Sequence, residues 1–167
     1  MRGFLFLLLL GCPPRQPVPV SGPVEETQAS TPASLEQPVT IETLRQWLSH
    51  HDFAGCASVQ SAKISVSQWA EVAERVEIPP WVPIRAAICV VELYGEEGLP
   101  AYLRWVAAPQ WLGLSRVVVE RIDILPEDAA LSVAKAALNG PDEEYVMRRL
   151  KNSAHPAVQQ LLSAAAY

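Results

Sequence analysis

Long hydrophobic runs, basic clusters and glycine-rich phosphate loops are all missing from this sequence of 167 residues. A membrane-spanning helix needs about 20 apolar residues, and no run approaches that length, which excludes a polytopic membrane protein. The net charge is −5, and no basic cluster is longer than Arg148, Arg149 and Lys151. Because a nucleic-acid binder normally presents a basic face, we expect no nucleic-acid partner.

The N-terminal segment combines one positive charge with a short apolar run. Arg2 precedes an unbroken apolar stretch from Phe4 to Leu10. As a helix this stretch would cover roughly 10 Å, whereas the hydrocarbon core of a bilayer is about 30 Å thick. It is therefore typical of the apolar region of a secretion signal. A buried N-terminal helix is the alternative, and Pro13 and Pro14 count against it because they would end it at once.

The tetrapeptide Leu9-Leu10-Gly11-Cys12 follows this run and resembles the lipobox of bacterial lipoproteins, in which a small residue precedes Cys. The resemblance implies that residues 1–11 are a signal peptide, that Cys12 is lipidated and that the protein is exported. Two or more acyl chains give a stable membrane anchor, whereas one binds only marginally. The alternative is an ordinary secretion signal in which Cys12 is incidental.

A lipoprotein of this kind is anchored to the bacterial cell envelope, with its domain facing the periplasm or the exterior. Pro13, rather than Asp, follows the lipid-bearing cysteine. In some bacteria that would imply the outer membrane, although the sorting rule varies between groups.

Residues 12–38 contain the lipid attachment site and a proline-rich linker. Seven of the fifteen prolines lie between Pro13 and Pro38, a stretch with no aromatic residue and no helical periodicity. Such a composition cannot bury enough apolar surface to offset chain entropy, so we expect disorder. A proline-rich segment of this length reaches at most about 80 Å, which suits a spacer between membrane and domain. A tail of no selected length is the alternative.

Residues 39–167 carry helical patterns with short breaks and no convincing alternating strand, which predicts an all-α domain. Thr40 can cap the first helix, and Ser65 with Gln68 forms a capping box for the second. We expect Val76 to point inward near the end of the second helix. Residues 51–64 resist assignment and are left as a loop or a broken helix. The helices are expected at residues 41–50, 65–77, 81–94, 97–107, 110–124, 127–138, 142–151 and 157–166.

An internal repeat appears when the sequence is shifted by 31 residues. Arg85 then falls on Arg116, and the acidic corner at residues 95–98 falls on residues 126–129. Each unit reads as helix, tight corner and helix. A helical hairpin buries little surface alone, so stacked hairpins share a continuous core.

Pro83-Ile84-Arg85 with Ala87-Ile88 resembles the start of a HEAT-type repeat, a helical hairpin whose first helix often opens with proline and an apolar–Arg pair. Ser115-Arg116 departs from the pattern because Ser stands in the apolar position. His155-Pro156-Ala157-Val158 resembles the start of a final unit, with Gln159 in place of Arg. The resemblance spans about residues 79–167. It implies a HEAT-like, solenoid-like stack that binds proteins rather than catalysing a reaction; the alternative is an irregular helical bundle.

Two cysteines, Cys56 and Cys89, remain once Cys12 is lipidated, and an even pair in an exported protein suggests a disulfide. Cys89 lies on the same helix side as Arg85 and Glu92, outside the centre of the apolar stripe, so we expect it to be reachable. A bridge would staple residues 51–64 to the repeats and add about 3–4 kcal/mol in the chain-entropy model. Buried free thiols are the alternative.

The segment His50–Cys56 is the only candidate for metal binding or catalysis. Zinc sites need about four ligands at recognisable spacings, and His50, His51, Asp52 and Cys56 fit no standard pattern. A solvated helix end explains the histidines equally well, because cations are favoured near a helix C-terminus. No nucleophile-elbow or CxxC motif occurs. We therefore expect no enzyme, metal, cofactor or small-molecule substrate, with a small envelope enzyme or metal-binding protein as the alternative.

Five tryptophans are many for this length, and Trp81 and Trp111 open equivalent helices. Aromatic side chains often dominate binding energy at interfaces, so an exposed pair would mark a partner-binding site. Packing between adjacent hairpins is the competing interpretation. The sequence thus predicts a lipid-anchored envelope protein that acts as a docking or scaffolding module for another envelope protein. A module that binds cell-wall glycan through exposed tryptophans is a further alternative.

Overall fold

The computed structural model describes residues 39–60, 62–76 and 79–165. The chain divides into two units, Met1–Ala33 and Ser34–Tyr167, and the described residues belong to the second. The predicted signal peptide, the lipid attachment site Cys12 and the linker 12–38 lie outside the described residues.

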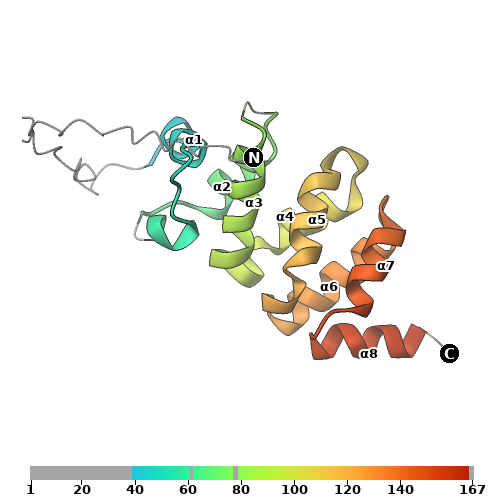
Figure 1. Ribbon diagram of the computed structural model, residues 1–167. Coiled ribbons are helices and arrows are strands. Elements are labelled where there is room, and N and C mark those ends of the chain that lie inside the picture. The colour runs from blue at the N-terminus through green and yellow to red at the C-terminus, as the bar shows by residue number, and fades with distance from the viewer. Residues whose placement is uncertain (1–38, 61, 77–78, 166–167) are drawn as a thin grey trace, which may run out of the picture. The chain divides into compact units, whose positions relative to one another are not determined.

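The domain is all-α, as the sequence predicts, and no strand occurs among the described residues (Figure 1). Short 3₁₀ helices lie at Cys56–Val59, Gly95–Gly98, Pro109–Trp111 and Ile122–Ile124. None of the helices in the described residues is both long and apolar enough to cross a bilayer. The α-helices are α1 (Ile41–Ser49), α2 (Val66–Ala73), α3 (Trp81–Tyr94), α4 (Leu99–Ala107), α5 (Leu112–Glu120), α6 (Glu127–Leu138), α7 (Glu143–Lys151) and α8 (Pro156–Ala165).

Local signals begin and end several of these helices where the sequence predicts. The Thr40 side chain accepts a hydrogen bond from the Thr43 amide at 3.1 Å and so caps α1. Ser65 and Gln68 form the complete capping box at the start of α2. Gly95 follows α3 with a φ of 44°, a conformation that L side chains rarely adopt, so glycine is needed at this turn.

The helices form two rows of stacked hairpins. Odd-numbered helices pack in chain order, α1 on α3, α3 on α5 and α5 on α7, and α3, α5 and α7 follow one another in Figure 1. In the other row α4 packs on α6 and α6 on α8, whereas α2 packs mainly on α3. This arrangement is a stack of helical hairpins, as the internal repeat predicts.

The core between the rows contains three large aromatic side chains that are fully buried, Trp69, Tyr102 and Trp105. The Tyr102 hydroxyl donates a hydrogen bond to the Val90 carbonyl at 2.9 Å, which satisfies it inside the core. Burial raises the pKa of Tyr102. A Cβ atom at Gly98 would come within 2.1 Å of the Tyr102 hydroxyl, so the close approach of the Gly95–Gly98 turn requires glycine there.

Several boundaries differ from the sequence prediction, and the helix expected to begin at Glu97 begins at Leu99 instead. The second helix ends at Ala73 rather than Glu77, and Val76, predicted to point inward, is 100% exposed. The reason is tertiary, because the Glu74 carboxylate accepts hydrogen bonds from Arg104 and Trp105 and fastens the helix end to α4. The helix expected at residues 110–124 is divided into α5 and two flanking 3₁₀ helices, and residues 51–64 contain the 3₁₀ helix Cys56–Val59.

The repeat alignment holds for the helices but not for the corners. Gly95–Gly98 is a 3₁₀ helix between α3 and α4, whereas residues 126–129 include the first turn of α6. Ser115, which occupies the apolar position of the second unit, is only 2% exposed. The buried face of α5 therefore accommodates a small polar side chain at this position.

Candidate functional site

Three residues of α3 hold the non-helical segment that follows α1. Trp81, Arg85 and Cys89 are four residues apart, so they lie along one side of the helix. Each contacts the segment between His50 and Cys56. We call this row the α3 clamp. It joins the N-terminal end of the described chain to the rest of the stack.

The disulfide of the clamp joins Cys56 to Cys89, with their Cα atoms 5.1 Å apart and 33 residues of sequence separation. This confirms the predicted pairing. The expectation that Cys89 is reachable is wrong, because Cys56 and Cys89 are 3% and 0% exposed. The 3₁₀ helix Cys56–Val59 packs against this side of α3 and covers the bridge.

Arg85 caps the C-terminal end of α1 from outside that helix. Its guanidinium donates hydrogen bonds to the carbonyls of Leu48, at 2.7 Å, and His50, at 2.5 Å. The last carbonyls of a helix lack partners within it and carry partial negative charge, so a guanidinium is well suited to them. The same group lies 5.5 Å from the centre of the Phe53 ring. Arg85 thus holds the end of α1 and the residue that follows it.

The His50–Cys56 segment does not assemble a metal centre in the structure. His50, His51 and Asp52 are exposed, and the Cys56 sulfur is committed to the disulfide. Among the described residues no group of three or more His, Cys, Asp or Glu side chains is placed to hold a metal ion. A bridged Cys56 offers no thiolate, so the enzyme or metal-binding alternative would need the bridge to be reduced.

Trp81 and Trp111 are both partly buried and pack against the core. The Trp81 ring centroid lies 5.3 Å from that of His51, at an interplanar angle of 44°. These positions fit packing between neighbouring elements. The partner-binding role of the pair stays a prediction, and neither ring stands free of its surroundings.

A groove of about 710 Å³ is lined by residues of α2 and α4 and of the segments that precede these two helices. Its buried lining comes from Ile64, Ala70 and Ala101. Two of these three side chains are alanines, which leaves space that larger residues would fill. No local sequence pattern predicts this groove, because the space depends on how α2 packs against its neighbours.

The exposed lining of this groove is acidic. Three carboxylates, Glu71, Glu74 and Glu97, face one guanidinium, Arg104, which gives the lining a net charge of −2. Tyr94 lies at the same groove, where its hydroxyl accepts a hydrogen bond from the Trp69 indole at 3.1 Å. Burial raises the pKa of Tyr94, the hydrogen bond from Trp69 lowers it, and the Glu97 charge raises it further.

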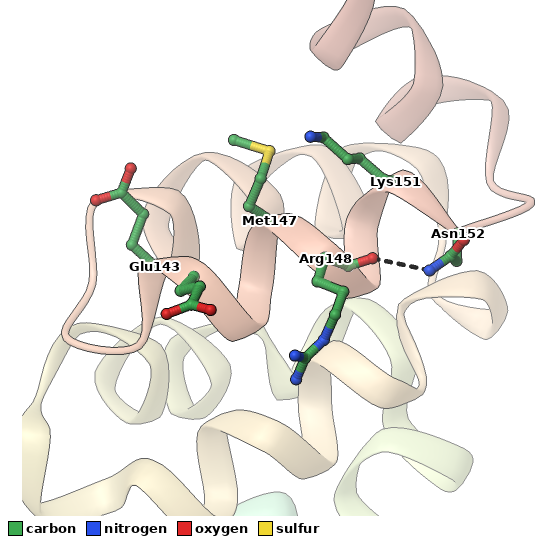
Figure 2. Close-up of a pocket in the computed structure, with 6 residues that line it drawn as sticks. Glu143, Met147, Arg148, Lys151 and Asn152 are labelled. Carbon is green, nitrogen blue, oxygen red and sulfur yellow. Dashed lines mark hydrogen bonds between the residues drawn. The ribbon is translucent and has the colours of Figure 1, made fainter.

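A second hollow, of about 560 Å³, runs along the outer side of α7 (Figure 2). Glu143 and Glu144 lie at one end of it, and Arg148 and Lys151 at the other, so the charges balance. The Arg148 guanidinium lies 5.7 Å from the Tyr145 ring centre. The helix dipole explains acid at the start and base at the end without a ligand.

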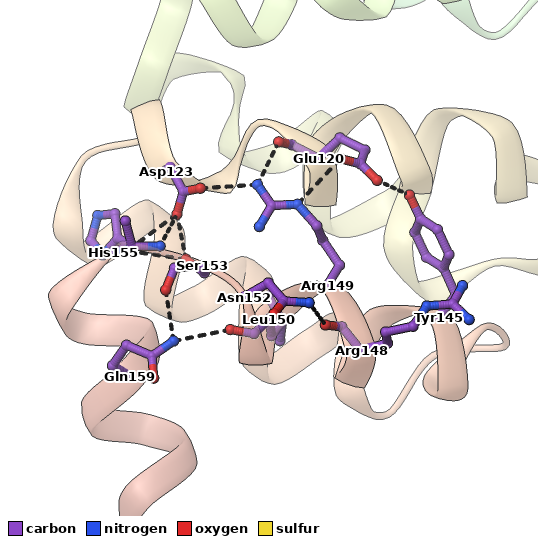
Figure 3. A network of polar contacts seen from close by, with 11 residues as sticks. Glu120, Asp123, Tyr145, Arg148, Arg149, Leu150, Asn152, Ser153, His155 and Gln159 are labelled. Carbon is purple, nitrogen blue, oxygen red and sulfur yellow. Dashed lines mark hydrogen bonds and ion pairs between the residues drawn. The ribbon is translucent and has the colours of Figure 1, made fainter.

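A network of polar contacts fastens the turn between α7 and α8 to the end of α5 (Figure 3). One oxygen of Asp123 accepts hydrogen bonds from the Ser153 hydroxyl and from the amides of Ala154 and His155. Its other oxygen pairs with Arg149 at 2.9 Å. Burial alone would raise the pKa of Asp123, but hydrogen bonds from Ser153 and Arg149 lower it below its ordinary value. We interpret this network as structural, because the contacts of Asp123 fix the turn between α7 and α8. The Nδ1 atom of His155 is buried without a hydrogen-bond partner among the described residues.

Comparisons of the chain with protein-family models, with curated proteins and with solved structures found no match. The class of protein therefore rests on the fold and on the residues themselves. The described part is a stack of helical hairpins with a disulfide-closed N-terminal end and an acidic groove.

Proposed function

We propose that this chain is a lipid-anchored envelope protein that docks another protein onto its helical stack. The observation that carries the proposal is the bridge between Cys56 and Cys89. Disulfides persist in oxidising compartments outside the cytosol, which supports export. The chain has three cysteines, so the bridge leaves Cys12 as the remaining one, directly after a lipobox-like sequence.

The docking role is supported by the kind of surface that stacked hairpins make. Such stacks present long exposed helical faces, and they commonly serve as binding surfaces. In this chain the groove between α2 and α4 adds a concave site to that surface. The alternative, a glycan-binding module, requires exposed tryptophans. Trp81 and Trp111 are partly buried, which favours protein docking over this alternative.

Membrane partition of the full chain tests the anchor. The wild type and a Cys12→Ser variant are expressed in a bacterial host and separated into membrane and soluble fractions. We expect the wild type in the membrane fraction and the variant in the soluble exported fraction, with Cys56 and Cys89 bridged in both. Equal partition of the two proteins would remove the anchor from the proposal.

Chemical cross-linking in intact cells tests the docking role. We expect the membrane-anchored full chain to yield a stoichiometric cross-linked complex with one other envelope protein. Recovery of the chain solely on isolated peptidoglycan would replace protein docking with glycan binding. The Cys12→Ser variant is the control, because its folded domain is unchanged while its place at the membrane is lost.

A further inference from the structure

We propose that the groove between α2 and α4 binds a basic segment of a partner protein, with a Lys or Arg of that segment paired to Glu97. The inference rests on the proposed docking function and names the site and the chemistry of its partner. The ion pairs of the groove distinguish one of its carboxylates from the others.

Glu97 is the one carboxylate of the groove that makes no ion pair within the described part of the chain. Glu71 pairs with Arg75 at 2.5 Å, and Glu74 pairs with Arg104 at 2.6 Å. Glu97 makes no ion pair with any residue in the described part of the chain. It is exposed at the groove edge. A cation placed against it gains an attraction that the chain itself leaves unused.

The apolar part of the groove accepts a side chain of the same segment. Ala70 and Ala101, from facing helices, are 5% and 2% exposed and contribute little volume. The space of about 710 Å³ is an open hollow, which suits a side chain of a segment that lies across the surface. A segment that combines apolar and basic residues therefore matches both parts of the lining.

The linker 12–38 and a second copy of the chain are the two occupants that the protein itself could supply, and the charge of both is unfavourable for this groove. The linker 12–38 contains Arg15 and three glutamates, Glu25, Glu26 and Glu36, and so carries the same sign as the groove. A second copy of the chain has a net charge of −5. Like charges brought together at an interface are unfavourable, so the favoured occupant is a basic segment of a different protein.

Binding of a probe peptide to the full, acylated chain in detergent micelles tests the proposal. The probe is a short fluorescent peptide of alternating leucine and lysine, and its counterpart has glutamate in place of lysine. We expect the basic probe to bind and the acidic one not to bind. Glu97→Gln should weaken binding about threefold to fivefold, in line with one partly exposed ion pair.

Glu96→Gln is the matched control, because Glu96 is the adjacent exposed glutamate of the same 3₁₀ helix and does not line the groove. It should leave the affinity unchanged. Both variants should keep the midpoint of thermal unfolding of the wild type. Equal weakening by the two substitutions would show general charge attraction and overturn the proposal, as would failure of the basic probe to bind.

A photo-cross-linking residue at Ser67, an exposed position of the groove, identifies the natural occupant in cells. We expect cross-links to a segment with net positive charge in another protein, and their loss in Glu97→Lys. Cross-links to residues 12–38 or to a second copy would overturn the proposal. These failures leave the docking function itself intact, because membrane partition and complex formation are measured separately.

Discussion

The two ends of the helical stack hold their irregular segments by different means. At the N-terminal end the segment between α1 and α2 is joined to α3 by a disulfide and by Arg85. At the C-terminal end the turn between α7 and α8 is held by hydrogen bonds and an ion pair centred on Asp123 (Figure 3). The N-terminal attachment is covalent and the C-terminal one is polar and depends on protonation.

The kind of attachment at each end matches the length of the segment that it holds. Residues 50–65 form a long connection with one short 3₁₀ helix, so ordering it costs much chain entropy. The turn between α7 and α8, Asn152–His155, is short, and a single carboxylate that accepts three hydrogen bonds suffices to fix it.

Removing the disulfide should have the largest effect on stability. Cys56→Ala with Cys89→Ala opens a loop of 33 residues of sequence separation. We expect the free energy of unfolding to fall by about 3–4 kcal/mol, measured by urea denaturation of the full chain. Cys12→Ser is the control and should leave the value unchanged. A loss below about 1 kcal/mol would mean that the bridge is incidental to the N-terminal end.

Breaking the polar attachment at Asp123 should lower the free energy of unfolding somewhat less than removing the disulfide does. Asp123→Ala removes the acceptor of the Ala154 amide and one of the two acceptors of the His155 amide, which also bonds the Ser153 hydroxyl at 3.1 Å. It also removes one of the partners of Arg149. We expect a loss of about 2–3 kcal/mol, again by urea denaturation. The control is Asp128→Ala, which removes an exposed carboxylate from the first turn of α6 and should cost about 0.5 kcal/mol. Similar losses for both variants would contradict the network.

Arg85 should contribute less to the free energy of unfolding than the disulfide or the Asp123 network. Arg85→Ala removes the donor to the Leu48 and His50 carbonyls, both at the end of α1, and we expect a loss of about 1–2 kcal/mol. Arg121→Ala is the matched control, since Arg121 pairs with Glu92 at 3.5 Å on the surface and such pairs contribute about 0–1 kcal/mol. Protection of the α1 amides in hydrogen exchange should drop in Arg85→Ala but not in the control.

The smallest expected effect is a pH dependence of stability that comes from the C-terminal attachment alone. The pKa of Asp123 is lowered in the folded chain, so its ionised form stabilises the fold above the unfolded value of about 4. That contribution is lost as the pH falls through the folded pKa. The difference in unfolding free energy between wild type and Asp123→Asn should be constant from pH 7 to about pH 5 and shrink below about pH 4. A constant difference down to pH 3 would contradict this role of Asp123.

The sequence predicts those features of the fold that local chemistry determines. Thr40 and the Ser65–Gln68 pair cap helices where expected, and α3 and α6 have the expected bounds. The pairing of the two domain cysteines is confirmed, although the exposure of Cys89 is not. Their prediction followed from cysteine count and export, which need no knowledge of packing.

The features that the sequence does not predict depend on contacts between distant residues. Val76 continues a helical pattern but is exposed, because α2 is fastened to α4 through Glu74. Asp123 and Ser153 are 30 residues apart, and nothing local marks either as part of a network. The groove beside Glu97 is lined by Ala70 of α2 and Ala101 of α4, and no local sequence pattern predicts that these two residues line one site.

The intact mass of the protein taken from the membranes of its native cells tests the central claim most directly. The account predicts a chain that begins at Cys12, heavier than its amino acids by covalently bound acyl groups and lighter by two hydrogens for the bridge. An intact leader with an unmodified Cys12 thiol, found in the soluble cytosolic fraction with Cys56 and Cys89 reduced, would contradict it.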